Sequence, residues 1–233
     1  LRTAVNQHAK LDDRAFQSHC QFSPCYCRCS QSLSLAPATI LDASTHHEKI
    51  LMAKQALILI DIQNDYFPQG KLPLVGVEAA ADKARQLLQA FRQAGDAVIH
   101  VRHEFTADDA PFFTPGSEGA HLHPKVLNEN DEPVVLKHFV NAFRQTNLRE
   151  VLEQRSITDL VVVGSMSHMC IDAVVRAAAD YGYTVTVIHD ACATRDLEFN
   201  GKTVAAAQVH EAYMASLAFA YASVVSADEF LKA

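Results

Sequence analysis

Residues 56–67 read ALILIDIQNDYF, and this stretch decides how the rest of the chain is interpreted. Its first part, Ala56 to Ile60, is a continuous apolar run, which is typical of a strand buried on both faces of a parallel sheet. The run stops at Asp61. Apolar residues then recur at helical spacing from Val77 to Phe91, and Gly95 follows where helices often end. The pattern predicts a strand followed by a helix.

This alternation of strand and helix continues along the chain. Further short apolar runs predict strands, and segments between them with apolar residues at helical spacing predict helices. We therefore predict a single α/β domain with a Rossmann-like, doubly wound sheet of six parallel strands and helices on both faces. The further predicted strands are 97–101, 133–136, 160–163, 184–188 and 223–225, and the further helices 146–155, 170–181 and 203–221.

The composition limits the classes of function. The 233 residues are 49% hydrophobic, enough for a substantial core, and they carry 20 basic against 27 acidic side chains, a formal charge of −7. Such a chain lacks the positive surface that binds a nucleic-acid backbone or an anionic membrane. No apolar run approaches the roughly 20 residues of a membrane span. We expect a cytoplasmic protein with a small-molecule substrate, and neither nucleic acid nor membrane as a partner.

The first 51 residues differ from the rest. They show no sustained helical or strand period, are rich in Ser, Gln and His, and precede Met52 and the first strand. We interpret residues 1–51 as a leader outside the core, either disordered or the result of a mis-set translation start, and residues 52–233 as the domain. The leader's cysteines lack the paired C-x2-C spacing of zinc sites, so we predict no metal there. They are Cys20, Cys25, Cys27 and Cys29.

The ends of the predicted strands carry the candidate chemistry, because ligands of doubly wound sheets bind beyond the carboxyl ends of the strands. Asp61 ends the first strand, Lys137 ends the third, and Cys170 follows the turn after the fourth. A carboxylate, an ammonium group and a thiol would then share one edge. Each residue alone also fits an ordinary structural role, and their coincidence is what indicates a site.

A thiol at such an edge suggests nucleophilic catalysis. A free cysteine has a pKa of about 8.5, so it needs activation at neutral pH. A helix start at Cys170 and the charge of Lys137 would lower this pKa by about two units, and Asp61 would accept the proton. The turn from Gly164 to Cys170 supplies backbone N–H groups suited to an oxyanion. We expect the thiolate to be the main form at rest.

Three blocks of the sequence resemble a known family. Residues 57–67, LILIDIQNDYF, are similar to the opening signature of the isochorismatase-like cysteine hydrolases, which include nicotinamidases and N-carbamoylsarcosine amidase. Residues 135–143, VLKHFVNAF, resemble the family's lysine segment, and residues 163–172, VGSMSHMCID, its nucleophile turn. The blocks stand in the right order at the expected strand ends, and the resemblance covers essentially residues 52–233.

The resemblance implies a sheet in the order 3-2-1-4-5-6 and a covalent mechanism. It assigns Asp61 as proton acceptor and donor, Lys137 as electrostatic partner and Cys170 as nucleophile. It also implies a cis peptide between Ser165 and Met166, with the backbone N–H groups of Met166 and Cys170 as oxyanion donors. The expected reaction cleaves an amide-like C–N bond of a small molecule through an acyl-enzyme, without a cofactor.

One departure from the family bears on metal binding. Nicotinamidases carry an Asp-x-His metal motif after the second strand, whereas this chain reads His103-Glu104-Phe105. Only His123 matches the downstream metal ligand. We therefore predict no required metal and do not expect nicotinamide as the substrate.

The long segment 102–132 has the character of a loop that covers the substrate. Around it we expect residues that line the pocket, although aromatic residues at a sheet edge are as often plain packing. The candidates for substrate binding are Gln63, Phe67, His103, Phe112, Phe113 and His168.

Two alternative functions stay open at this point. Isochorismatase-type hydrolysis of a vinyl ether needs protonation by Asp61 but no sulfur nucleophile, and a non-catalytic ligand-binding protein would keep only the fold. A separate expectation concerns assembly: the predicted helix 203–221 is apolar on nearly all sides, and one sheet face does not cover that much. We expect it to pack against a second subunit in a homodimer or a larger homo-oligomer.

Overall fold

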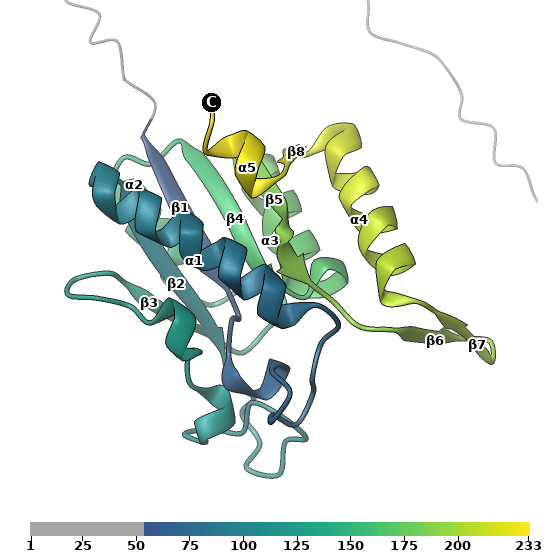
Figure 1. Cartoon of the computed structure of the whole chain (residues 1–233). Helices are drawn as coiled ribbons and strands as arrows, with labels where there is room; N and C mark the ends of the chain where they lie inside the picture. Colours follow the sequence, from purple (N-terminus) through teal and green to yellow (C-terminus); the bar gives the residue numbers. More distant parts are fainter. Residues whose placement is uncertain (1–53) are drawn as a thin grey trace, which may run out of the picture. The chain divides into compact units, whose positions relative to one another are not determined.

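A six-stranded parallel sheet forms the centre of the domain in the computed structural model, which describes residues 54–233 (Figure 1). The leader predicted at residues 1–51 lies outside the described residues. The strand order is β3-β2-β1-β4-β5-β8, with all neighbouring pairs parallel. This confirms the doubly wound sheet, and β8 is the sixth strand of the expected order. The strands are β1 (Gln55–Ile60), β2 (Ala97–His103), β3 (Val134–Lys137), β4 (Asp159–Ser165), β5 (Thr184–Ala193) and β8 (Ser223–Val225).

Helices cover both faces of the sheet, as expected. In Figure 1, α1 (Val77–Ala94) crosses in front of the strands with α5 (Ala227–Phe230) beside it, and α3 (Asp172–Asp180) lies behind. On the same face as α3 lie α2 (Leu148–Gln154) and α4 (Ala206–Ala220), whose buried apolar residues form one hydrophobic core with those of α3. We call it the second core, and the core under α1 the first.

Each strand of the centre contributes to two cores. Leu57 and Leu59 of β1 pack under α1, whereas Ile58 and Ile60 face α2 and α3, and all four side chains are at most 1% exposed. Successive side chains of a strand point to opposite faces, so a strand covered on both sides must be apolar throughout. The unbroken run that opens the sequence therefore has a direct physical cause.

A small hairpin between β5 and α4 was not predicted. It consists of β6 (Leu197–Phe199) and β7 (Lys202–Val204), joined by Asn200 and Gly201. Both turn residues have positive φ, 50° and 70°, which is the backbone conformation that Asn-Gly pairs favour in two-residue hairpin turns. The predicted start of the last long helix at Thr203 was wrong, because this residue pairs in β7 and the helix begins at Ala206.

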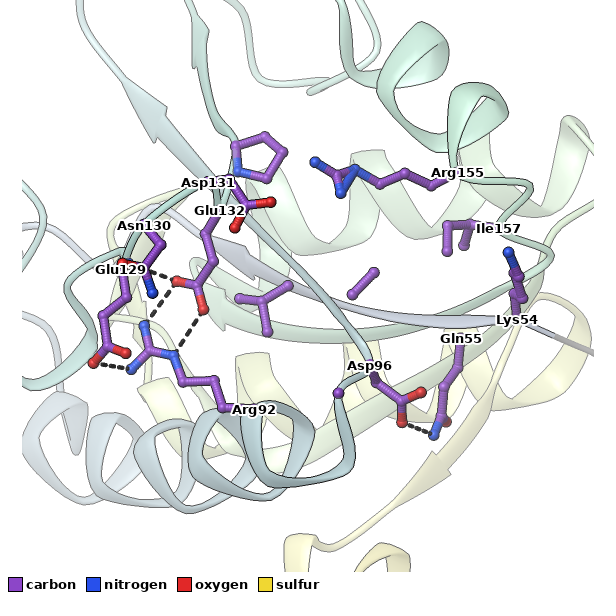
Figure 2. A pocket seen from close by; sticks show the side chains of 14 residues that line it. Lys54, Gln55, Arg92, Asp96, Glu129, Asn130, Asp131, Glu132, Arg155 and Ile157 are labelled. Carbon is purple, nitrogen blue, oxygen red and sulfur yellow. Dashed lines mark hydrogen bonds and ion pairs between the residues drawn. The ribbon is translucent and has the colours of Figure 1, made fainter.

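A cavity of about 650 Å³ opens at the amino-terminal edge of the sheet, opposite the edge where the catalytic candidates end their strands (Figure 2). Beside it, Arg92 of α1 holds Glu132 through two hydrogen bonds of 2.7 Å. His100 Nε2 lies 3.1 Å from the same carboxylate. Burial alone would raise the pKa of Glu132, but these partners lower it to about 2. The cluster fixes the end of the long loop just before β3.

Gly164 of β4 lies in register with Ile60 of β1 and has a φ of 123°. A β-carbon placed there would collide with the carbonyl oxygen of Ile60. The two strands that carry Asp61 and the turn to Cys170 therefore approach each other at a position that excludes a side chain.

We expect Gly164→Ala to lower the free energy of unfolding by about 3 kcal/mol or more, because backbone strain and a backbone collision add together. The matched control is Gly182→Ala, which has a φ of 89° but open space around the added carbon. It should cost only about 1 kcal/mol. Urea denaturation measures both changes, and equal losses in the two variants would contradict the close approach of β1 and β4.

Candidate active site

The three residues predicted to meet at the carboxyl edge do meet there. Lys137 is the last residue of β3, Asp61 follows β1, and Cys170 lies in a π-helical turn, Ser167–Ile171, after β4. The Lys137 ammonium nitrogen is 2.7 Å from Asp61 Oδ2 and 3.2 Å from Cys170 Sγ. Lys137 and Asp61 are fully buried, and Cys170 is 6% exposed. Residues far apart in the sequence thus form one cluster.

A fourth residue, His103 at the end of β2, completes the surroundings of Lys137. Its Nδ1 lies 3.0 Å from the ammonium nitrogen. An ammonium group has three N–H donors and no acceptor, so Asp61, Cys170 and His103 supply one acceptor each. Burial lowers the pKa of His103 to about 4, and the charge of Lys137 acts in the same direction. The imidazole is therefore neutral at physiological pH.

The electrostatics of Cys170 reverse the expectation of a resting thiolate. Burial raises the pKa of its thiol well above the usual value, Asp61 raises it further, and Lys137 only partly opposes them. The negative charge of the cluster thus sits on Asp61, paired with Lys137, while the sulfur keeps its proton. We correct the prediction accordingly: the sulfur becomes nucleophilic when its proton moves, and not before.

Asp61 has a positive φ of 50°, which is uncommon for a residue other than glycine. Its backbone N–H still donates to Val101 O at 2.9 Å, so the residue is held between β1 and β2. Strained backbone of this kind persists where the surroundings fix it, often at functional sites. This backbone conformation directs the Asp61 carboxylate toward Lys137 and not into either hydrophobic core.

The turn before Cys170 also departs from ordinary backbone geometry. The peptide between Ser165 and Met166 is cis, as the resemblance implies. Ser167 is fully buried, and its hydroxyl lies 2.8 Å from His210 Nδ1 on α4. This contact ties the turn to a helix of the second core. Sequence patterns gave no sign of it, because the two residues are 43 positions apart.

Gln63 shapes the site through the backbone. Its amide nitrogen donates to the carbonyls of His103 and Ala120, both at 2.8 Å, and its oxygen accepts from His103 N–H at 2.7 Å. The side chain is fully buried. We therefore expect Gln63 to position His103 and the covering loop, with no direct contact to substrate.

The aromatic candidates form a connected cluster around His103. The ring of Phe105 meets that of His103 edge-on at 4.8 Å, and Phe113 lies 6.1 Å from it. Phe112 contacts both Phe105 and Phe113, each at 5.1 Å. Phe113 is fully buried, so it serves as packing, whereas Phe112 and Phe105 are partly exposed.

The remaining candidates have other contacts. Phe67 is 4% exposed and stacks on His123 at 3.5 Å, which places both in the support of the loop. His168 is half-buried within the nucleophile turn, and its Nδ1 lies 2.6 Å from Thr194 Oγ1. It stays a candidate for substrate contact.

Sequence reasoning missed Tyr66 and Asp65. Burial raises the pKa of the buried Tyr66 hydroxyl, and electrostatic interaction with Asp61 and Cys170 raises it further. Asp65 accepts from the Phe113 N–H at 2.6 Å and from the Lys71 N–H at 3.1 Å, which anchors the covering loop. Both residues belong to the opening signature at residues 57–67. A polar group within such an apolar stretch was the sequence signal that could have identified them.

The residues around His103 do not fit a metal ion. Its Nδ1 is occupied by Lys137, Phe105 stands two positions later, and His123 stacks on Phe67. Within residues 54–233, no three His, Cys, Asp or Glu side chains are grouped to hold a metal. We therefore derive no step through a metal.

Residues 55–229 match the family described as Isochorismatase domain. The chain belongs to the isochorismatase family of hydrolases. It is 47% identical over 177 residues to YddQ of Bacillus subtilis, an uncharacterized isochorismatase family protein, covering 76% of this chain and 98% of the relative. It is 30% identical over 178 residues to the nicotinamidase of Escherichia coli strain K12, covering 60% of this chain and 84% of the relative.

The fold of this isochorismatase-family chain also agrees with solved structures. A provisionally assigned isochorismatase hydrolase from Oleispira antarctica is 60% identical and superposes with a TM-score of 0.75, covering 77% of this chain and 97% of the other. Within the described part of the chain, the search for a helix long and apolar enough to cross a membrane finds none.

We expect Asp61→Asn to lower the pKa of the Cys170 thiol, because it removes a negative charge that raises that pKa. Alkylation of Cys170 by iodoacetamide should then shift its midpoint to lower pH by about one unit or more. Between the two midpoints, the fraction of Cys170 present as thiolate should be higher in Asp61→Asn than in the wild type. Mass spectrometry of the Cys170 peptide across a pH series measures the shift, and an upward shift would contradict the assigned electrostatics.

Proposed function

We propose that the protein hydrolyses an amide-like C–N bond of a small molecule through a thioester on Cys170. The observation that carries this proposal is the buried contact of one ammonium group with a carboxylate and a thiol, at 2.7 and 3.2 Å. Such an arrangement provides a nucleophile, a proton acceptor and a fixed positive charge within hydrogen-bond reach of one another.

In the first half of the reaction, Asp61 takes the thiol proton as Cys170 Sγ forms a bond to the substrate carbonyl carbon. The carbonyl oxygen becomes an oxyanion, which the backbone N–H groups of Met166 and Cys170 stabilise. The C–N bond then breaks, and Asp61 returns the proton to the leaving nitrogen. The products are a neutral amine or ammonia and a thioester.

In the second half, water attacks the thioester carbon and gives one proton to Asp61. The C–S bond breaks, the acid product leaves, and the sulfur regains the proton from Asp61. Lys137 stays protonated throughout, because burial alone would lower its pKa but Asp61 and Cys170 raise it above the usual value. Its role is to stabilise negative charge on either the carboxylate or the sulfur.

The raised pKa of Cys170 suits this scheme. A thiol with a high pKa holds its proton until a substrate carbonyl is in place, so reactive thiolate does not accumulate in the empty site. Membership in a family that contains a nicotinamidase, which cleaves an amide, supports the same reaction class. Vinyl-ether hydrolysis needs only protonation by Asp61, and a non-catalytic protein needs neither Asp61 nor Lys137 beside the thiol. The Lys137–Cys170 contact therefore favours the thioester route over both alternatives.

We expect Cys170→Ala to abolish hydrolysis of small amides, with a fall in kcat/KM of about a thousandfold or more. Cys192→Ala is the matched control, because Cys192 is also a buried cysteine, whereas the sulfur that Lys137 contacts belongs to Cys170. Activity is measured with a panel of primary amides, ureido acids and lactams, with mass spectrometry to detect acylated Cys170. Retained hydrolysis of these compounds by Cys170→Ala would contradict the thioester route.

We also propose that the protein assembles as a homo-oligomer through α4. Its buried residues, such as Val209 and Leu217, face the sheet, while the outward face is mostly alanine and ends in Phe219, which is 91% exposed. Phe199 of the β6–β7 hairpin is 72% exposed as well. Large exposed aromatic side chains of this kind are typical of surfaces that meet a partner. The cytoplasmic location stays a prediction.

We expect light scattering at micromolar concentration to show at least a dimer, and Phe219→Glu to shift the mass toward the monomer. A charge at the centre of an apolar contact costs several kcal/mol, which is a large share of a typical association energy. Leu127→Glu is the control, since Leu127 is 51% exposed and precedes β3 at the other end of the sheet. A wild-type protein that is only monomeric would refute the assembly.

A further inference from the structure

The side of His103 that faces away from Lys137 has no partner. Nδ1 is occupied by the Lys137 ammonium, which has only donors, so Nδ1 accepts and the proton of the neutral ring sits on Nε2. His103 is 7% exposed, and its Nε2 is buried without a hydrogen-bond partner among residues 54–233. A buried donor without an acceptor is energetically unfavourable, so such a group calls for an explanation.

The surroundings of this N–H are mainly aromatic. Phe105 meets the ring edge-on, and Phe113 lies on a second side. The backbone carbonyl of Phe139 is near enough to favour the protonated ring, yet it makes no hydrogen bond to Nε2. A single directed donor among apolar rings is the arrangement by which proteins orient a small ligand.

Both nitrogens of His103 therefore bear on the proposed reaction, on which this inference rests. Nδ1 takes one of the three N–H groups of Lys137, so the other two are directed at Asp61 and Cys170. Gln63 fixes the backbone of His103 on both its N–H and its C=O. The ring is thus held in position, and its tautomer is set from the catalytic side.

We propose that His103 is both a positioning residue for Lys137 and a specificity residue, whose Nε2–H donates a hydrogen bond to an acceptor atom of the substrate. The substrate class is a small amide that carries a neutral acceptor, such as a carbonyl, ether or ring nitrogen, beyond the scissile bond. Phe105, which meets the His103 ring edge-on, and Phe112, which contacts Phe105, add apolar surface nearby. A cationic or purely alkyl group at this place is disfavoured.

Two variants separate the two roles. His103→Asn keeps a carbonyl acceptor near Lys137 but removes the Nε2–H, whereas His103→Phe removes both and keeps the ring. Neither experiment depends on knowing the natural substrate, because Cys170 itself reports on them. The reagents are N-(2-methoxyethyl)chloroacetamide and N-butylchloroacetamide, which differ by one ether oxygen in place of a methylene. Cys170 Sγ displaces chloride from either, and the mass of the Cys170 peptide measures the rate.

In the wild type we expect the ether reagent to half-saturate at about tenfold lower concentration than the butyl reagent, the effect of one hydrogen bond. His103→Asn should lose this preference, and its maximal rate should fall less than that of His103→Phe, because a carbonyl acceptor for Lys137 remains. His103→Phe should lose the preference and also react at least about tenfold more slowly, because Lys137 is no longer oriented.

A second measurement reads the tautomer directly. Long-range ¹⁵N NMR of histidine-labelled protein, with the His103 signal assigned by its loss in His103→Asn, should show a neutral ring with Nε2–H from about pH 7.5 to about pH 5. Lys137, Asp61 and His138 are the ionisable groups that act on this ring. An Nδ1–H tautomer, or titration near the ordinary histidine value, overturns the proposal.

The outcomes also separate this inference from the proposed function. A wild type that reacts with both reagents equally overturns the specificity role while leaving the thiol chemistry in place. A His103→Phe variant with the wild-type maximal rate overturns the positioning role. A wild-type Cys170 that reacts with neither reagent overturns the proposed function together with this inference. If the Phe139 carbonyl accepted the Nε2–H hydrogen bond in solution, the wild type would react equally with both reagents, which is the first of these outcomes.

Discussion

The buried ammonium of Lys137 is the interaction on which the rest of the site depends. A charge taken out of water costs several kcal/mol unless every one of its donors finds an acceptor. Here Asp61, His103 and Cys170 provide the three acceptors, and they come from the ends of β1 and β2 and from the turn after β4. Removal of one partner from such a buried pair typically costs about 3–5 kcal/mol. With Lys137 itself at the end of β3, the cluster therefore joins the ends of four strands as well as serving chemistry.

The same constraint explains the state of the sulfur. A single positive charge shared by a carboxylate and a thiol stabilises one negative charge well and two poorly. With Asp61 ionised, Cys170 keeps its proton, and its raised pKa follows. The helix start at Cys170 and the charge of Lys137 together predict a lowered pKa of the thiol from the sequence. The correction comes from burial and from the carboxylate, and both are properties of the folded state.

The sheet was largely predictable from sequence, and the site was predictable in part. Continuous apolar runs such as 56–60 require burial on both faces, which fixed the strands, and the strand ends located Asp61, Lys137 and Cys170. The parts that were missed depend on contacts across the chain. His103 as a partner of Lys137 and Ser167 as a partner of His210 have no local signal, because 34 and 43 positions separate them. The hairpin at 197–204 did carry a local signal, its Asn-Gly turn. Its two strands are only three residues long, however, and the helical pattern that follows them is a stronger signal.

The covering loop is fastened in its middle and at its end before β3. In its middle, Gln63 donates to the Ala120 carbonyl and Asp65 accepts from the Phe113 N–H, which ties the loop to the opening signature. Near β3, Arg92 holds Glu132 at the opposite edge of the sheet (Figure 2). His100 contacts the same carboxylate. A segment anchored in this way can exchange the exposed residues between its anchors without loosening the strands that bear the reacting groups. Divergence of substrate preference within this lineage, and laboratory redesign of it, would accordingly concentrate at positions such as 106–109, which are exposed and carry none of these anchors, while the catalytic geometry is inherited intact.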